Sequence, residues 1–260
     1  MDKSNINLIK NNFDKVNFVL DSGAFTAWKS GKPIALDDYC KFIESLPFKP
    51  WRYFMLDVIG DAKGTLKNYE LMLKRGFNPI PVFTRGEDLS VLEEYYKTSD
   101  VVGIGGLVGT QGNKGFVKGI MSKIGSRKVH WLGFTSHDFL TVYKPFMCDS
   151  SSWLTTSRFG TSRVYLGSGQ FKAVRDNDFL SPDSALMHAC QRLKVEINSL
   201  KDQRNWTKGM RYPSLLSAAS SIKYSFDVKE KLGVNLFMVM NVSYYTSILL
   251  EAYERLEGLN

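Results

Sequence analysis

The feature of this sequence that most constrains its fold is an alternation of short apolar runs with helix-like segments. Runs of β-strand length recur at residues 16–21, 52–58, 79–84, 101–107, 129–134, 146–149 and 164–167. Amphipathic helical patterns separate several of them, at residues 36–46, 64–75, 89–97 and 116–124. This alternation is typical of βα units around a parallel sheet. About seven such units predict an α/β fold, a TIM-like (β/α)8 barrel that is complete or irregular.

The pattern changes after about Phe179. Ser181-Pro182-Asp183 has the composition of a helix start, and residues 185–200, 213–224 and 236–256 have helical patterns. No Pro/Gly/Ser-rich linker separates this part from the rest. We therefore expect one domain, with a barrel core at about 16–178 and a mainly helical C-terminal part at about 179–260.

Composition and cysteine usage exclude several classes of protein. The 260 residues include no apolar stretch near the roughly 20 residues of a membrane span, and the N-terminus lacks a signal-peptide pattern. We therefore expect a cytoplasmic protein with no membrane partner. The three cysteines form no CxxC and no Cys/His cluster, and the three histidines lack ligand spacing. A disulfide framework, a zinc subdomain and any other metal site are thus not expected.

The chain is basic, with a net charge of +8 from 34 Lys and Arg against 26 Asp and Glu. Such an excess is typical of proteins that bind a polyanion through phosphate contacts, and it is equally compatible with a merely basic soluble protein. The positive residues are densest between Lys114 and Lys128 and recur further along the chain. The side chains that we expect to contact nucleic acid are Lys114, Lys118, Arg158 and Arg163.

Three of the strand-length runs end in an aspartate: Asp21, Asp57 and Asp149. Because the carboxyl ends of parallel strands gather at one edge, these carboxylates are expected to meet in space. Two or three carboxylates around one pocket suit glycosyl transfer, which requires a nucleophile, an acid/base and a group that holds the base. The pattern therefore favours an enzyme.

Each of these acids has a plainer interpretation. Asp21 is as well placed to cap a helix as to do chemistry, since it precedes a turn at Gly23. Asp61 is a better helix cap than Asp57, which leaves Asp57 for a ligand. A carboxylate suits a guanine-like base, because it accepts hydrogen bonds from both N1–H and the exocyclic amine. The residues beside Asp149, Ser150-Ser151-Ser152, either orient its carboxylate or form an ordinary loop.

A glycine-rich segment, Gly103-Ile104-Gly105-Gly106-Leu107, ends another strand. It lacks the spacing of a dinucleotide-binding loop. It indicates either a tight turn or a close approach of the Gly105 and Gly106 backbone to a flat base.

Taken together, these motifs resemble the tRNA-guanine transglycosylase superfamily, and most of all its short phage and bacterial branch that inserts 7-deazaguanines into DNA. Residues 21–25 (Asp-Ser-Gly-Ala-Phe) resemble its DSGGF motif, and residues 55–57 resemble its base-recognising acid. Residues 105–107 resemble its GGL motif, residues 130–133 its H-x-L-G strand, and residues 149–153 its DSASY-type nucleophile segment. The likeness covers about residues 17–155, in family order.

The resemblance implies an enzyme that exchanges guanine in a nucleic acid for a free 7-deazaguanine base, without a cofactor. Asp149 would be the nucleophile and Asp21 the general acid/base. The residues implied around the base are Ser22, Phe25, Asp57, Arg85, Gly105 and Gly106.

The sequence also departs from the family. The zinc ligands of the tRNA enzymes are missing, and no C-terminal RNA-binding domain is evident, so DNA is the expected polymer, in a host cytoplasm if a phage encodes the protein. Arg85 stands near the position of a base-recognising glutamine, where it contacts a base substituent or a phosphate, or is an ordinary surface charge. The alternatives are the same reaction on tRNA, a non-catalytic nucleic-acid-binding barrel, and a metabolic barrel enzyme.

Overall fold

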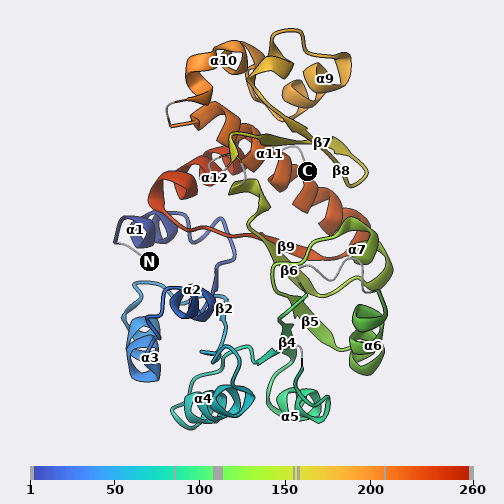
Figure 1. The fold of residues 1–260 in the computed structure, drawn as a ribbon. Helices are drawn as coiled ribbons and strands as arrows, with labels where there is room; N and C mark the ends of the chain where they lie inside the picture. Colours follow the sequence, from blue (N-terminus) through green and yellow to red (C-terminus); the bar gives the residue numbers. More distant parts are fainter. Residues whose placement is uncertain are drawn as a thin grey trace. The chain divides into compact units, whose positions relative to one another are not determined.

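The computed structural model describes residues 3–84, 86–107, 114–154, 156, 159–207 and 209–257. It is an α/β structure whose chain divides into two compact units (Figure 1). We call Ile6–Phe134 the N-terminal unit, and Thr135–Asn260 together with Met1–Asn5 the C-terminal unit. The division therefore falls earlier than the change of sequence pattern near residue 179. The single-domain organisation stays a prediction.

Helices and strands alternate along the N-terminal unit, as the sequence predicts. Its strands are β1 (Val19–Leu20), β2 (Arg52–Tyr53), β3 (Val82–Phe83), β4 (Val101–Ile104) and β5 (Lys128–Trp131). Its helices are α1 (Lys3–Asn11, which begins in the other unit), α2 (Ala24–Lys29), α3 (Leu36–Ser45), α4 (Ala62–Lys74), α5 (Ser90–Thr98) and α6 (Lys114–Ile124). The predicted cap is confirmed, because the Asp61 side chain accepts a hydrogen bond from the Gly64 N–H at the start of α4.

The strands of the N-terminal unit pair in parallel and in chain order. β1 pairs with β2, a bridge joins Phe54 to Ile80, β3 pairs with β4, and β4 pairs with β5. All residues of β4 are buried, as is typical of a parallel strand covered on both faces. Because parallel strands end at the same edge, the loops that follow β1 to β4 lie along one edge, which we call the carboxyl edge.

The C-terminal unit is built around α11 (Arg211–Leu232), a helix of 22 residues (Figure 1). This helix contacts β7 (Ser162–Gly167), β9 (Asn235–Met238), η1 (Ser152–Leu154) and α12 (Ser243–Leu256). Small buried residues such as Ser217 and Ala218 allow these neighbours to approach it closely. β6 pairs in parallel with β9, and β7 pairs with β8 as an antiparallel hairpin. The elements are α7 (His137–Tyr143), β6 (Met147–Ser150), η1 (Ser152–Leu154), β7 (Ser162–Gly167), β8 (Gln170–Val174), η2 (Asp176–Phe179), α9 (Ser184–Arg192), α10 (Ile197–Lys201), η3 (Gln203–Trp206), α11 (Arg211–Leu232), β9 (Asn235–Met238) and α12 (Ser243–Leu256).

Three predictions were wrong in the C-terminal unit. The helix expected over 185–200 is two helices, α9 and α10, because the chain turns at Lys194, whose φ is 53°. The helix expected over 236–256 begins instead as strand β9 and becomes helical only in α12. The run at 164–167 is a strand as predicted, within β7, but it belongs to the antiparallel β7–β8 hairpin and not to a βα unit of a parallel sheet. By contrast, the helix start at Asp183 is confirmed, since its side chain accepts from the Leu186 N–H.

Candidate functional site

Two of the three predicted acids lie at the carboxyl edge of the N-terminal unit. Asp21 directly follows β1, and Asp57 lies three residues beyond the bridge at Phe54. The Ser22 hydroxyl lies 3.2 Å from Oδ1 of Asp57 and donates a hydrogen bond to it, which links the two loops. Asp21 is exposed and Asp57 is partly buried. The structure thus brings Ser22, the neighbour of Asp21, into contact with Asp57, whereas the meeting of the three acids in one pocket stays a prediction.

Asp21 is not the capping residue of the helix that follows it. The N-cap of α2 is Gly23, whose φ of 76° lies in the left-handed region that favours glycine. The Ser22 hydroxyl accepts a hydrogen bond from the Ala24 N–H at the same turn. The alternative interpretation, in which Asp21 caps the following helix, is therefore wrong.

A third acid, Glu87, lies at this edge and was missed by the sequence reasoning. Its carboxylate accepts a hydrogen bond of 2.6 Å from the Thr84 N–H, just after β3. Burial raises the pKa of Glu87, and the charge of Asp57 raises it further. Burial also raises the pKa of Asp57, against the opposing effect of hydrogen bonds from its own backbone and from Ser22. The only available signal was an acid shortly after a buried strand.

Two buried tyrosines extend this acidic edge into the protein. The Tyr39 hydroxyl donates a hydrogen bond of 2.7 Å to the Phe54 carbonyl. Burial and then the charge of Asp21 raise the pKa of Tyr39. Tyr95 has its pKa raised by burial and then by the charge of Glu87, and its buried hydroxyl has no hydrogen-bond partner among the described residues. Both phenols therefore stay neutral; the O–H of Tyr39 is used by the Phe54 carbonyl, and the O–H of Tyr95 has no acceptor among the described residues.

Gly105 and Gly106 lie at the same edge, directly after β4. The Gly105 N–H donates to the Phe83 carbonyl at 2.8 Å, so the sheet uses this donor and a base edge cannot. Gly106 has a φ of 71°, so the backbone turns here in a way that favours glycine. The predicted contact from the Gly105 N–H to a base is therefore excluded, whereas contacts from the Gly105 carbonyl and from the Gly106 backbone stay predictions.

An exposed aromatic pair follows Asp21 and Ser22. Phe25 and Trp28, both on α2, are 56% and 55% exposed, and their rings stack with centroids 6.0 Å apart. The Lys29 ammonium lies 4.6 Å from the centre of the Phe25 ring. Nucleobases stack on exposed aromatic side chains, and a nearby cation adds to the attraction. Phe25 was predicted as a base contact; Trp28 was not.

The third predicted acid, Asp149, lies in the C-terminal unit, on β6. In the β6–β9 pairing Asp149 is opposite Phe237, whereas Ser150 is opposite Met238. Ser150 and Met238 line a pocket of this unit, so strand alternation directs Asp149 to the other face. The Ser150 hydroxyl bonds to the Ser152 hydroxyl at 2.8 Å and accepts from the Ser152 N–H. It therefore shapes a turn at the end of β6, and the orientation of the Asp149 carboxylate by these serines stays a prediction.

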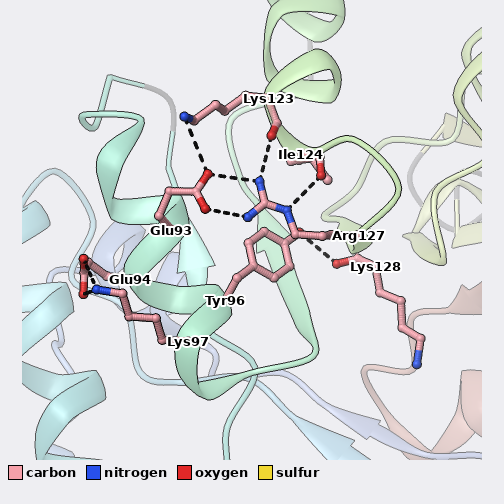
Figure 2. Close-up of polar contacts among 8 residues, drawn as sticks. All are labelled: Glu93, Glu94, Tyr96, Lys97, Lys123, Ile124, Arg127 and Lys128. Carbon is pink, nitrogen blue, oxygen red and sulfur yellow. Dashed lines mark hydrogen bonds and ion pairs between the residues drawn. The ribbon is translucent and has the colours of Figure 1, made fainter.

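The basic stretch from Lys114 to Lys128 is partly neutralised by acids of its own unit. Figure 2 shows Arg127 bound through two nitrogens to Glu93, which Lys123 also approaches at 3.6 Å. Glu94 pairs separately with Lys97 (Figure 2), and Lys128 lies 3.3 Å from Asp100. Of the predicted nucleic-acid contacts, Lys114 and Lys118 are exposed on α6 and form no ion pair with a described residue.

Of the three other predicted cations, one lies in a pocket and two lie outside the described residues. Arg163, on β7, lines the pocket of the C-terminal unit. Arg85 and Arg158 lie outside the described residues, so their predicted roles stay predictions.

Two general features limit the chemistry at these sites. Within the described ranges, no three His, Cys, Asp or Glu side chains cluster in a way that would hold a metal ion. None of the described helices combines the length and the apolar character that crossing a membrane requires. Comparisons with protein-family models, with curated proteins and with solved structures found no match to this chain.

Proposed function

We propose that this protein is a DNA guanine transglycosylase, which exchanges guanine in DNA for a free 7-deazaguanine base. The observation that carries the proposal is the carboxyl edge of the N-terminal unit. There Ser22 joins the loops of Asp21 and Asp57, and the exposed Phe25–Trp28 pair lies on α2, the helix that directly follows Asp21 and Ser22 in the chain. Acceptors for a base edge and rings for a base face thus occur within a few residues of each other.

The state of Asp57 supports a ligand with hydrogen-bond donors. Burial raises its pKa because few donors compensate the buried carboxylate. Guanine and 7-deazaguanines offer N1–H and an exocyclic amine, which would replace lost water and favour the charged form. Binding of such a base would therefore lower the pKa of Asp57 and release a proton.

We further propose that the fold is a TIM-like barrel. The parallel strands of the N-terminal unit pair in chain order from β1 to β5. Consecutive strands are neighbours in a (β/α)8 barrel, whereas the order reverses at a switch point in a doubly wound sheet. Chain-order pairing therefore favours the barrel.

In the proposed reaction the Asp149 carboxylate attacks C1′ of the target nucleotide, and the C1′–N9 bond of guanine breaks. Asp21 donates a proton to the departing guanine. The incoming base then loses its proton to Asp21 and attacks C1′, which breaks the ester bond to Asp149. The reaction requires no oxidant or cofactor, because one glycosidic bond replaces another.

DNA is the proposed polymer, reached through phosphate contacts that include Lys114 and Lys118. The target nucleotide has to leave its stack, at a cost of about a few kcal/mol. Stacking on the exposed Phe25–Trp28 pair would recover part of that cost.

The test is to incubate the protein with DNA and, in parallel, with tRNA, each with labelled 7-deazaguanine bases, and to follow incorporation by nucleoside mass spectrometry. Incorporation into DNA that Asp149→Asn abolishes supports the proposal, as does a trapped protein–DNA adduct that maps to Asp149. Incorporation into tRNA alone would reassign the polymer. No incorporation into either polymer would refute the proposal.

A further inference from the structure

The C-terminal unit contains a pocket of about 180 Å³ that the proposed reaction does not use. It lies between β6, β9, the β7–β8 hairpin, α11 and the start of α7, on the face of β6 opposite Asp149. Hydroxyl, imidazole, guanidinium and aromatic groups line it, and none of its lining residues is acidic. They are Thr135, Ser136, His137, Ser150, Ser152, Arg163, Gly169, Phe171, Ser221, Tyr224, Leu236 and Met238.

Arg163 is the charged group of this pocket, and one hydrogen bond and one aromatic contact position it. Its backbone N–H donates to the Ser217 hydroxyl at 3.0 Å, and its guanidinium lies 4.4 Å from the centre of the Phe171 ring. Burial lowers the pKa of Arg163. No described residue forms an ion pair or a hydrogen bond with its guanidinium. A partly buried cation without an acidic partner is costly to the fold unless an anion compensates it.

Asp227 follows the pocket-lining residues Ser221 and Tyr224 on α11, and its carboxylate already has two hydrogen-bond donors. Asp227 accepts hydrogen bonds from Lys223 at 2.7 Å and from the Tyr165 hydroxyl at 2.8 Å. Both of its oxygens are therefore occupied, and it leaves Arg163 available to a ligand.

Imidazole and hydroxyl groups line the same pocket as the guanidinium. One ring nitrogen of His137, Nδ1, lies 3.1 Å from the Tyr224 hydroxyl, which fixes the orientation of the imidazole. The same ring packs against Gly169, where a Cβ would lie 2.2 Å from it. The Ser150 and Ser221 hydroxyls are buried at the pocket wall. An arginine accompanied by hydroxyl donors, with no acid in the pocket, suits the binding of a phosphate-like anion.

We propose that this pocket binds a phosphate group, with Arg163 as its charged anchor and His137 and the serine hydroxyls as further donors. Its volume is below the range of roughly 300–1,000 Å³ of pockets for drug-sized ligands. The ligand is thus a free phosphate, a small phosphomonoester or a single backbone phosphate, and not a whole nucleoside. The proposal does not rest on the transglycosylase function.

The test is titration calorimetry of the full-length protein with inorganic phosphate, glycerol 3-phosphate and a short single-stranded oligonucleotide. We expect binding of phosphate that weakens about tenfold or more in Arg163→Gln, because a charge-assisted hydrogen-bonded pair is lost. Arg175→Gln is the matched control, since Arg175 is an exposed arginine at the end of the same hairpin and does not line the pocket. It should bind phosphate as the unchanged protein does.

The three probes distinguish the source of the phosphate. Tighter binding of glycerol 3-phosphate than of the oligonucleotide identifies a small monoester, and oligonucleotide binding that phosphate competes away identifies a DNA backbone phosphate. A second measurement needs no variant: phosphate should protect Arg163 from phenylglyoxal, as mapped by mass spectrometry. Absence of phosphate binding in the unchanged protein, equal binding by a folded Arg163→Gln, or failure to protect Arg163 would overturn the proposal.

Discussion

The carboxyl edge of the N-terminal unit and the pocket of the C-terminal unit contain charged groups of opposite sign, and the pKa values of both are shifted for the same physical reason. At the edge, burial raises the pKa of Asp57 and of Glu87. In the pocket, burial lowers the pKa of Arg163. Each shift moves the group toward its neutral form, because a buried charge loses its hydration. Neither region contains enough opposite charge to restore the usual pKa.

The contrast teaches how ligand chemistry can be inferred from what a fold leaves uncompensated. The ion pairs of Figure 2 are complete, since Glu93 satisfies Arg127, and they leave nothing for a ligand. The edge offers acceptors to a molecule with N–H groups, and the pocket offers donors to an anion.

The largest expected effect concerns the catalytic acids. Asp149→Asn should abolish base exchange and leave no covalent adduct, because an amide is not a competent nucleophile here. Asp21→Asn should slow exchange by about 10²- to 10⁴-fold, the usual contribution of a general acid/base. Single-turnover assays with labelled base would measure both. Asp138→Asn, an exposed acid of α7, should retain full activity; if it falls as far as Asp21→Asn, the role of the edge is wrong.

The next effect separates free from paired cations. Lys114→Gln with Lys118→Gln should reduce the slope of log affinity against log salt by about 2, since each lost phosphate contact removes about one unit. Fluorescence anisotropy with a DNA duplex at several salt concentrations measures the slope. Lys123→Gln is the control, because Lys123 lies 3.6 Å from Glu93 and is already paired. Equal slopes for the two variants would contradict the assignment.

A smaller effect is a pH-dependent gain in stability. The folded-state pKa of Asp57 is raised, so its protonated form favours folding below the unfolded pKa, and this contribution is lost as the pH rises through the folded pKa. Asp57→Asn should therefore unfold at a higher Tm than the unchanged protein at pH 7, and the difference should disappear below about pH 4. It should also raise the KM for the incoming base.

Thermal melts between these two pH values provide the measurement. Asp61→Asn is the control, because it keeps a capping oxygen at the exposed start of α4 and should change Tm little at either pH. A lower Tm for Asp57→Asn at pH 7 would show that the carboxylate stabilises the fold.

The smallest effect concerns the surface pairs of Figure 2. Glu93→Gln removes the partner of Arg127 and of Lys123, so a slight fall in the urea midpoint is expected. Glu94→Gln breaks only an exposed pair with Lys97 and should leave the midpoint unchanged. A larger loss for Glu94→Gln would mean that this network does not hold α5 to α6.

Local signals predicted much of the N-terminal unit and less of the C-terminal unit. Helix caps such as Asp61 and Asp183 act on the next few residues, so the sequence reveals them. The strand β9 depends on pairing with β6, far earlier in the chain, and its apolar residues therefore look like the start of a helix. The left-handed turn at Lys194 has no glycine to announce it.

The sites divide in the same way. Asp21 and Asp57 follow apolar runs and were found from sequence, whereas the burial of Glu87 depends on how its loop folds back to Thr84. The pocket around Arg163 needs His137 and Tyr224, which only the folded chain brings together. Its charge was evident from the sequence, but its lack of an acidic partner was not.

The order of strand pairing also has a consequence for synthesis on the ribosome. Each strand from β1 to β5 pairs with one that has just emerged, so the N-terminal unit gains its contacts progressively as the chain lengthens. Within the C-terminal unit, β6 pairs with β9, which emerges only after the β7–β8 hairpin and the helices α9 to α11. Until then its apolar residues, Met147 and Cys148, lack this neighbour. The nascent chain therefore exposes this edge of β6 until β9 has been synthesised. An exposed strand edge favours aggregation, so a chaperone would act mainly in this interval.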